Sequence, residues 1–288
     1  MGFFASVNGQ ITPAAEARVP VLDNGFTFGD SVYETLRTYG GRPFHLDRHL
    51  HRLRNSAERI AVAVPQPDQA LAAQLEALLA RAANAESYIR LIVSRGVGDL
   101  SYHFDRVQGP TIVMVVKPYE APAEHAETQG VAVAIVSIRR NSPQALDPAI
   151  KSCNLLNNIL AVREAQARGA LEAVLLNERG EIAEGASSNI FIVKQGVALT
   201  PPLSAGILPG ITRDVILERA AATGIPMREQ TLHVPDLLAA DEAFITSTLK
   251  EAAPIASVDG QPLGNGRPGP VTLRILQDFR EYARQHSR

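Results

Sequence analysis

One stretch, residues 150–193, constrains this chain more than any other. It reads IKSCNLLNNILAVREAQARGALEAVLLNERGEIAEGASSNIFIV. Its signals follow in a definite order: a lysine beside polar residues that can start a helix, an amphipathic helix, a β-hairpin, and a glutamate in a Gly/Ser-rich turn. A reactive amine and a carboxylate so close to small polar residues indicate a binding site for a cofactor.

The chain has only four lysines, and three of them stand where an exposed side chain is expected. These are Lys117 before a predicted linker, Lys194 before a predicted turn, and Lys250, which should form an exposed ion pair with Glu251. A lysine that forms a Schiff base must be partly desolvated, because only a neutral amine attacks an aldehyde. The three positions do not meet this condition.

Lys151 is the remaining candidate. It lies between an apolar strand predicted for residues 131–138 and a helix that Asn154 could cap. The alternative interpretation is a solvated lysine ahead of a helix, which the local sequence alone favours.

Glu184 is the second candidate. The segment EAVLLN, a turn at residues 178–180 and the segment EIAE predict a hairpin whose second strand ends at Glu184-Gly185. A carboxylate at such a strand end could pair with a pyridinium nitrogen and keep it protonated, since a nearby opposite charge favours the charged form. An ordinary edge-strand glutamate is the alternative.

Four segments together carry a resemblance to a known family. They are Lys151 with Asn154, EGASSNIF (Glu184–Phe191), PGITRD (Pro209–Asp214) and STLKEAAPI (Ser247–Ile255). In this order and at this spacing they resemble the pyridoxal 5'-phosphate (PLP) enzymes of fold type IV. That group contains branched-chain aminotransferases, D-amino-acid aminotransferases and aminodeoxychorismate lyases. The resemblance extends over nearly the whole chain.

The resemblance implies an α+β protein of two α/β domains with the cofactor at the domain interface. The length of 288 residues also suggests two domains. The Pro-bounded stretch KPYEAPA is the only convincing linker. We therefore expect a small N-terminal domain at 1–117, a linker at 118–123, and a larger C-terminal cofactor-binding domain at 124–288.

The resemblance also assigns residues that bind the cofactor phosphate. Arg52 matches the arginine of the family's H-x-x-R-L motif, and a guanidinium suits a phosphate because it donates two parallel charge-assisted bonds. Ile211 and Thr212 open a predicted helix, whose unpaired N–H groups would form an anion site. Thr248, a hydroxyl at a predicted strand end, is the third phosphate candidate.

Four further residues are candidates for the substrate pocket. Phe28, Tyr33 and Arg37 are carried over from the family's GD-x-V-[FY]-E stretch, although Tyr33 could equally be a core aromatic. Arg90 interrupts the apolar strand YIRLIV, so its charge requires a partner or a functional anion. It matches an arginine that branched-chain aminotransferases carry at this point.

These roles predict a PLP-dependent aminotransferase with ping-pong kinetics. Lys151 would hold the cofactor and then move the α-proton of the substrate, while Glu184 keeps the ring protonated. A branched-chain L-amino acid is the favoured donor. A D-amino-acid or (R)-amine transaminase remains open, although Leu100 and Tyr102 stand where D-amino-acid enzymes have arginine and histidine. An aminodeoxychorismate lyase, suggested by Thr35, and a catalytically silent scaffold of the same fold also remain open.

Composition argues against several other classes of protein. The formal net charge of −2 gives no reason to expect nucleic acid or a membrane surface as partner. The sequence contains no strand-G-x-G-x-x-G-helix unit, which is the pattern of a site for a nicotinamide cofactor. We also expect no metal site. The single cysteine, Cys153, excludes an internal disulfide and fits a reducing cytoplasm. We therefore expect a cytoplasmic protein, and the resemblance implies a homodimer or a larger homo-oligomer.

Overall fold

The computed structural model describes residues 2–121 and 128–287, which pack as two units. Unit 1 contains Met1–Glu120, Ile150–Asn154 and Ala283–Arg288, and unit 2 contains Ala121–Ala149 and Leu155–Tyr282. The chain passes from unit 1 to unit 2 within the linker predicted at 118–123, of which residues 122 and 123 lie outside the described residues. The segment with Lys151 packs in unit 1, although we placed it in the C-terminal domain from the sequence.

Unit 1 is built on a six-stranded antiparallel sheet. Its strands are β1 (Phe4–Val7), β2 (Gln10–Pro13), β3 (Ser31–Tyr39), β4 (Arg42–Pro43), β5 (Ser87–Ser94) and β6 (Thr111–Pro118). They pair in the order β2-β1-β6-β5-β3-β4. Asn8 and Gly9, both at positive φ, turn the hairpin of β1 and β2, and Gly40 and Gly41 turn the hairpin of β3 and β4.

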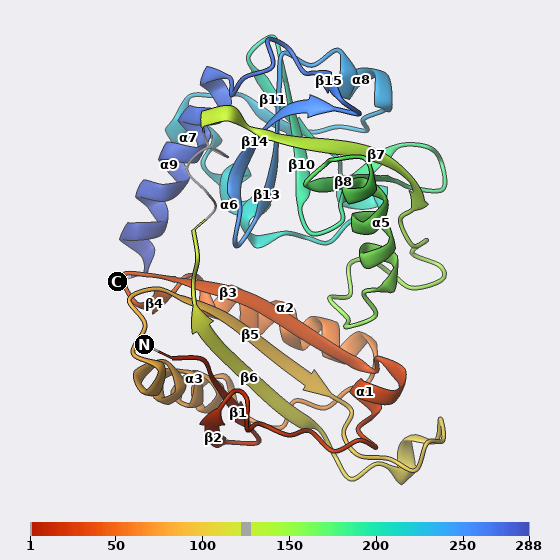
Figure 1. The fold of residues 1–288 in the computed structure, drawn as a ribbon, viewed down its shortest axis with the longest axis vertical. Coiled ribbons are helices and arrows are strands. Elements are labelled where there is room, and N and C mark those ends of the chain that lie inside the picture. The colour runs from red at the N-terminus through yellow and green to blue at the C-terminus, as the bar shows by residue number, and fades with distance from the viewer. Residues whose placement is uncertain (1, 122–127, 288) are drawn as a thin grey trace. The chain divides into compact units, whose positions relative to one another are not determined.

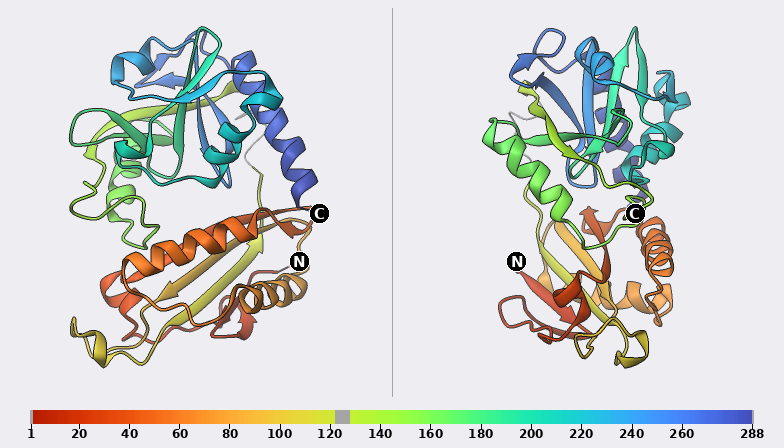
Figure 2. Two further views of the ribbon diagram at one scale, coloured as in Figure 1. Left: turned by 180° about the vertical axis from the view of Figure 1, so that it is seen from behind. Right: turned by 90° about the vertical axis from the view of Figure 1, so that its right-hand side faces the viewer.

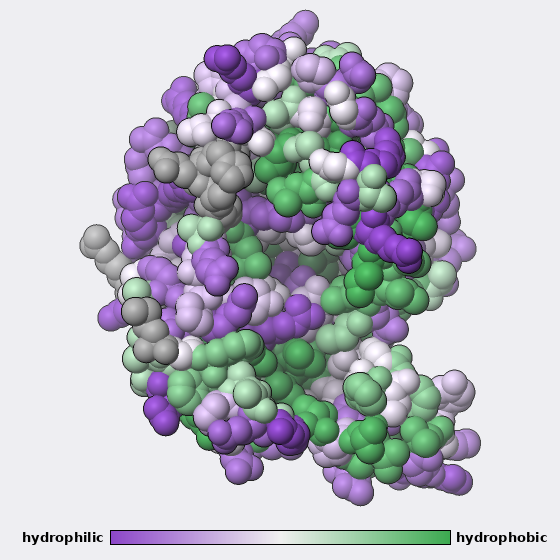
Figure 3. Space-filling model, in the orientation of Figure 1, coloured by the Kyte–Doolittle hydropathy of each residue, from purple (hydrophilic) through white to green (hydrophobic). Residues whose placement is uncertain are grey.

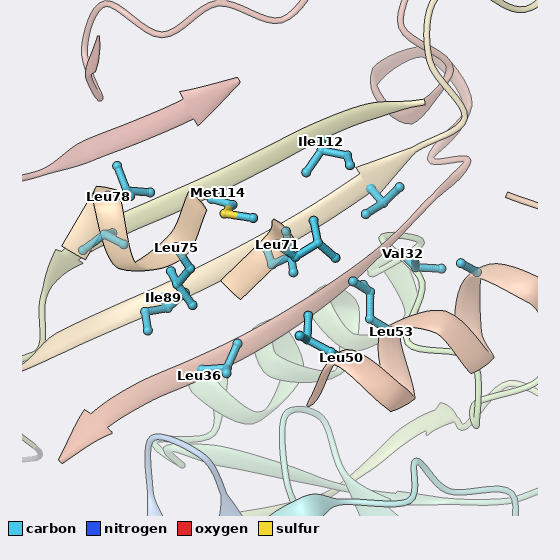
Figure 4. Packing of buried hydrophobic residues seen from close by; sticks show 14 of the residues in the cluster. Val32, Leu36, Leu50, Leu53, Leu71, Leu75, Leu78, Ile89, Ile112 and Met114 are labelled. Atoms are coloured by element: carbon cyan, nitrogen blue, oxygen red, sulfur yellow. The ribbon is translucent and has the colours of Figure 1, made fainter. Parts of the chain in front are cut away.

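Two long helices, α2 (Leu46–Arg59) and α3 (Asp68–Ala82), cover one face of this sheet, as Figures 1 and 2 show. Each buries an apolar stripe at helical spacing. Figure 4 shows Leu50 and Leu53 of α2 and Leu71 of α3 around Val32 and Leu36 of β3. Burying one such side chain contributes about 2 kcal/mol. Shorter helices of this unit are α1 (Asn24–Phe28) and η1 (Phe104–Arg106).

Unit 2 is built on a nine-stranded mixed sheet. Its strands are β7 (Val131–Arg139), β8 (Glu172–Leu176), β9 (Ile182–Gly185), β10 (Asn189–Lys194), β11 (Val197–Thr200), β12 (Met227–Glu229), β13 (Glu242–Ser247), β14 (Glu251–Val258) and β15 (Gln261–Pro262). They pair in the order β12-β11-β10-β13-β14-β7-β8-β9, and β15 pairs with β14. Only residues 186–188 join β9 to β10, which are far apart in this order, so the sheet must curl.

The register of unit 2 determines which residues share one end of the sheet. Asn189 lies opposite Thr246, and Ser247 lies opposite Glu251. The start of β10 and the turn at 248–250 between β13 and β14 therefore share one end. The loop at 186–188 reaches the same end, because it leads directly into β10.

The helices of unit 2 lie on both sides of its sheet, as the right-hand view of Figure 2 shows. They are α5 (Leu156–Ala167), α6 (Ile211–Glu218), α7 (Ala220–Thr223), α8 (Val234–Leu238), α9 (Pro270–His286) and the short η2 (Leu203–Ala205). Ala161 and Ala165 let α5 approach β7 and β8 closely. The predicted helix that opens at Ile211 ends at Glu218, and Arg219 separates it from α7.

The predicted cap of α5 is wrong. The N-cap residue is Leu155, and the side-chain amide of Asn154 donates to the carbonyl of Gly29 at 2.9 Å. Asn154 therefore ties the lysine segment to the loop that enters β3. The predicted α+β class is confirmed by the two units.

Candidate active site

Lys151 lies along the edge of β3 in unit 1, at the end of the strand that β4 does not pair. Its carbonyl accepts from the N–H of Tyr33 at 2.9 Å, and its own N–H donates to Ser56 Oγ of α2 at 3.1 Å. The next residue, Ser152, bridges Val32 in antiparallel fashion. The backbone of Lys151 is thus fixed between a strand and a helix, which restricts where its half-buried side chain can point.

Three of the predicted site residues come together at this edge. Lys151 Nζ lies 4.4 Å from the centroid of the Tyr33 ring, and Arg90 Cζ lies 4.0 Å from the same centroid. Burial raises the pKa of Tyr33, against the opposing effect of the Arg90 charge, so the phenol stays neutral at physiological pH. The Tyr33 ring therefore contacts two cations and is more than a core aromatic.

The other two pocket candidates have aromatic neighbours of their own. The ring of Phe28 lies 5.2 Å from that of Tyr102. Arg37 Cζ lies 4.1 Å from the ring centroid of Tyr39 and 3.8 Å from that of Tyr119. The structure thus groups Tyr33 and Arg90 with Lys151, and it stacks Arg37 between two tyrosines.

Sequence reasoning missed Glu34, a carboxylate that is 0% exposed. Arg52 donates to it through Nε at 2.7 Å and Nη2 at 2.8 Å, and His49 Nδ1 lies 2.7 Å from Oε2. Burial alone would raise the pKa of Glu34, but the charges and hydrogen bonds of Arg52 and His49 hold it well below its usual range. A glutamate on a strand opposite a helical H-x-x-R pair was the signal available in the sequence. Glu34 sets the orientation of the Arg52 guanidinium.

Replacing Glu34 with glutamine is expected to lower the free energy of unfolding by about 3 kcal/mol at pH 7, because Arg52 and His49 lose a buried carboxylate. The pKa of Glu34 in the folded state lies below its ordinary value of 4.5. Its stabilising effect is therefore present above that value and is lost as the pH falls toward the folded-state pKa. Urea unfolding should show the full difference between wild type and E34Q at pH 7 and a shrinking difference below about pH 4.

A matched control for this prediction is Asp68→Asn, which removes an exposed partner of Arg54. It should change the free energy of unfolding by at most about 0.5 kcal/mol. Equal stability of wild type and E34Q at pH 7 would contradict the role of Glu34.

Glu184 is the centre of the corresponding cluster in unit 2. It is buried at the end of β9, as predicted, and Arg140 Nε donates to its Oε1 at 2.7 Å. Its Oε2 accepts from Asn189 Nδ2 at 3.2 Å and from the N–H of Leu208 at 3.1 Å. Arg140 compensates the charge of the buried carboxylate. No local pattern in the sequence pointed to Arg140, because it follows β7, far from the hairpin.

The start of α6 adjoins this cluster. Gly210 is the N-cap residue, and a Cβ atom there would lie 1.9 Å from Asn189 Oδ1, so that a larger residue would displace the Asn189 amide from Glu184. Ile211 and the hydroxyl-bearing Thr212 form the first turn, and both are buried. The first N–H groups of a helix have no acceptor within the helix.

The predicted phosphate residue Thr248 lies half-buried in the turn between β13 and β14. Beside it in the sequence, Thr246 Oγ1 is buried without a hydrogen-bond partner among the described residues. Hydroxyls and an open helix N-terminus are donors that suit a phosphate, and the Glu184 carboxylate suits a protonated ring nitrogen. The donor set of unit 2 therefore fits a phosphorylated pyridine.

The family model described as "Amino-transferase class IV" matches residues 31–258. The chain belongs to this family. The match spans most of both units and includes Lys151, Glu184, Thr212 and Thr248. Membership of this family does not by itself select a substrate.

Relatives of this class IV aminotransferase match it over nearly their whole length. It is 39% identical to a protein named putative branched-chain-amino-acid aminotransferase of Methanocaldococcus jannaschii, over 96% of this chain and 94% of the relative. It is 35% identical to a D-alanine aminotransferase of Bacillus licheniformis, over 93% of each.

Solved structures agree with this family. The branched-chain amino acid aminotransferase of Escherichia coli is similar with a TM-score of 0.92 and 33% identity, over 99% of this chain and 96% of that one. A branched-chain amino acid aminotransferase of T.th., solved with pyridoxamine 5'-phosphate, has a TM-score of 0.93 and 30% identity, over 98% of this chain and 94% of that one. The predicted fold type, PLP cofactor and transaminase activity are confirmed for this class IV aminotransferase.

Two features are absent from the described residues of this class IV aminotransferase. No helix in residues 2–121 and 128–287 is long and apolar enough to cross a membrane. Within the same residues, no group of three or more His, Cys, Asp or Glu side chains could hold a metal ion.

Proposed function

We propose that this aminotransferase moves the amino group of a branched-chain L-amino acid to a 2-oxo acid. The observation that carries the proposal is the position of Arg90, whose guanidinium shares the ring of Tyr33 with the Lys151 amine. A carboxylate bound by Arg90 would hold its amino acid beside that amine. The relatives named branched-chain aminotransferases support the same choice.

We assign the residues that would hold the cofactor as follows. Lys151 binds it covalently, and Glu184 holds a proton at the ring nitrogen. The phosphate is bound by Arg52, by the N–H groups of Ile211 and Thr212, and by the hydroxyl of Thr248. When bound, PLP supplies an aldehyde that condenses with amines and a ring that accepts electrons from the substrate α-carbon.

The chain's own residues then account for proton transfer. The Lys151 amine would act as general base and then as general acid, taking up the proton that leaves the substrate α-carbon and giving it back. Its contact with the Tyr33 ring keeps water from one side of the amine. The same amine serves both half-reactions in turn, so the kinetics are ping-pong.

The visible spectrum of the purified enzyme tests the substrate assignment. We expect a yellow band that L-leucine bleaches and D-alanine leaves unchanged, when each is added without a 2-oxo acid. Addition of a 2-oxo acid should then restore the band, because the second half-reaction returns the amino group. Bleaching by D-alanine alone would overturn the choice of donor and leave the transaminase intact.

A D-amino-acid transaminase is the second candidate. D-alanine aminotransferases are among its relatives, at 35% identity for the Bacillus licheniformis protein. Leu100 and Tyr102 are exposed apolar and aromatic side chains in the loop where the D-amino-acid enzymes have arginine and histidine. Arginine and histidine are thus missing at those two positions, which favours the branched-chain assignment.

We also propose that the enzyme is a cytoplasmic homodimer. Leu156, Ile159 and Leu160 are exposed along one face of α5, and Figure 3 shows hydrophobic side chains gathered over this helix. A second copy of the chain would cover them. Sedimentation equilibrium distinguishes a dimer from a monomer, and cell fractionation tests the compartment, which the free thiol of Cys153 fits.

A further inference from the structure

Lys250 is not the exposed partner of Glu251 that the sequence suggested. Its Nζ donates to Glu172 Oε2 at 2.5 Å and to Ser187 Oγ at 2.7 Å, whereas Glu251 accepts from Arg280 Nε at 2.6 Å. The Glu172 side chain is 1% exposed and that of Lys250 25%. An ammonium pairs more strongly with a carboxylate removed from water than with a solvated neighbour, and the fold brings Glu172 within reach.

The Glu172 carboxylate collects four donors from three segments of unit 2. Its Oε2 accepts from Lys250, from Ser187 Oγ at 2.7 Å and from Ser188 Oγ at 3.1 Å. Its Oε1 accepts from the N–H of Ala173 at 3.1 Å. The start of β8, the loop at 186–188 and the turn at 248–250 are therefore joined through one buried group.

Two of these segments adjoin residues that we assign to opposite ends of the cofactor. The loop at 186–188 directly follows Glu184, assigned to the ring nitrogen, and the turn at 248–250 contains Thr248, assigned to the phosphate. We propose that Lys250 and Glu172 are positioning residues that fix the phosphate-binding turn against the loop that follows Glu184. This inference rests on the proposed function and concerns residues that do not themselves touch substrate.

The effect of losing Lys250 should fall on the phosphate end. Glu184 has contacts of its own with Arg140 and Leu208, which hold it whether or not Lys250 is present. The turn at 248–250 depends on the Lys250 side chain for its bonds to Glu172 and Ser187. Without the ammonium, the turn is released from the loop, and the Thr248 hydroxyl loses its fixed direction.

The experiment compares PLP with pyridoxal, which has the same ring and aldehyde but no phosphate. The visible band is titrated with each ligand in the full-length apoenzyme of wild type and Lys250→Met. We expect the dissociation constant of PLP to rise about tenfold in K250M, as for the loss of one hydrogen bond to a charged group, and that of pyridoxal to stay unchanged. A change in overall stability alone would move both constants together.

Two further variants complete the test. Arg280→Met breaks the ion pair of the neighbouring Glu251 without touching the bonds of Lys250 to Glu172 and Ser187, and should leave both constants unchanged. Lys250→Arg keeps the charge and should restore most of the PLP affinity. Should K250M fail to fold, Lys250→Gln, which keeps a donor without the charge, is judged by the same pair of titrations.

The outcomes separate this inference from the proposed function. Equal weakening of PLP and pyridoxal in K250M, or no weakening of either, would overturn the positioning role. A wild-type apoenzyme that fails to bind PLP at all would instead overturn the proposed function. This outcome is seen in the wild type alone, so it is distinguishable from the results for the variants.

Discussion

Replacing Lys151 with alanine is expected to lower turnover by about ten-thousandfold or more, since one amine both binds the cofactor and moves the substrate proton. The backbone contacts of Lys151 with Tyr33 and Ser56 do not involve its side chain, so the variant should keep the fold. Circular dichroism should match wild type, whereas the amino acid half-reaction should be too slow to bleach the spectrum.

Mass spectrometry after borohydride reduction identifies the lysine directly. The reduced cofactor should remain attached to the peptide that contains Lys151, and to no peptide of K151A. Lys194→Ala is the matched control, because Lys194 is exposed at the end of β10 and should be dispensable. A label on the peptide that contains Lys250 would show that the wrong lysine has been assigned, since Lys250 is also partly buried.

Patterns within short runs of the sequence predicted those elements of the fold whose residues are close together in the chain. The hairpin of β8 and β9 was predicted from two strand-like segments that flank the turn at residues 178–180. The structure shows this pairing, with Gly180 at positive φ. The helices α2 and α3 follow the same rule, because their apolar residues recur at helical spacing. The position of Glu184 was predicted for the same reason, because this residue stands at the end of a strand that the sequence indicates.

Partners that are far apart in the sequence could not be predicted in the same way. Arg140 and Glu184 are joined across 44 positions, and Glu172 and Lys250 across 78. Arg219, the residue between α6 and α7, likewise pairs with the distant Asp278 of α9, at 2.8 Å through Nη2. A periodic pattern records which face of an element is apolar, but it does not record which buried charge another element supplies.

Replacing Glu184 with glutamine is expected to lower kcat by about a hundredfold to a thousandfold, an effect comparable to the loss of a catalytic proton donor. A carboxylate holds a proton on the ring nitrogen because opposite charge favours the pyridinium, and a neutral amide does not. An unprotonated ring accepts electrons from the substrate α-carbon less readily. The pH titration of the visible band should shift in E184Q, whereas Glu178→Gln, at the exposed hairpin turn, should leave it unchanged.

A loss of activity in E184Q could also arise because Arg140 is left buried without its carboxylate, which costs stability. The double variant Glu184→Gln/Arg140→Met separates the two effects, since it replaces the whole ion pair with neutral groups. We expect it to regain most of the thermal stability that either single variant loses, because no uncompensated charge remains. Turnover should stay low, because the ring nitrogen still has no anionic partner. Recovery of turnover together with stability would show that Glu184 serves the fold and not the chemistry.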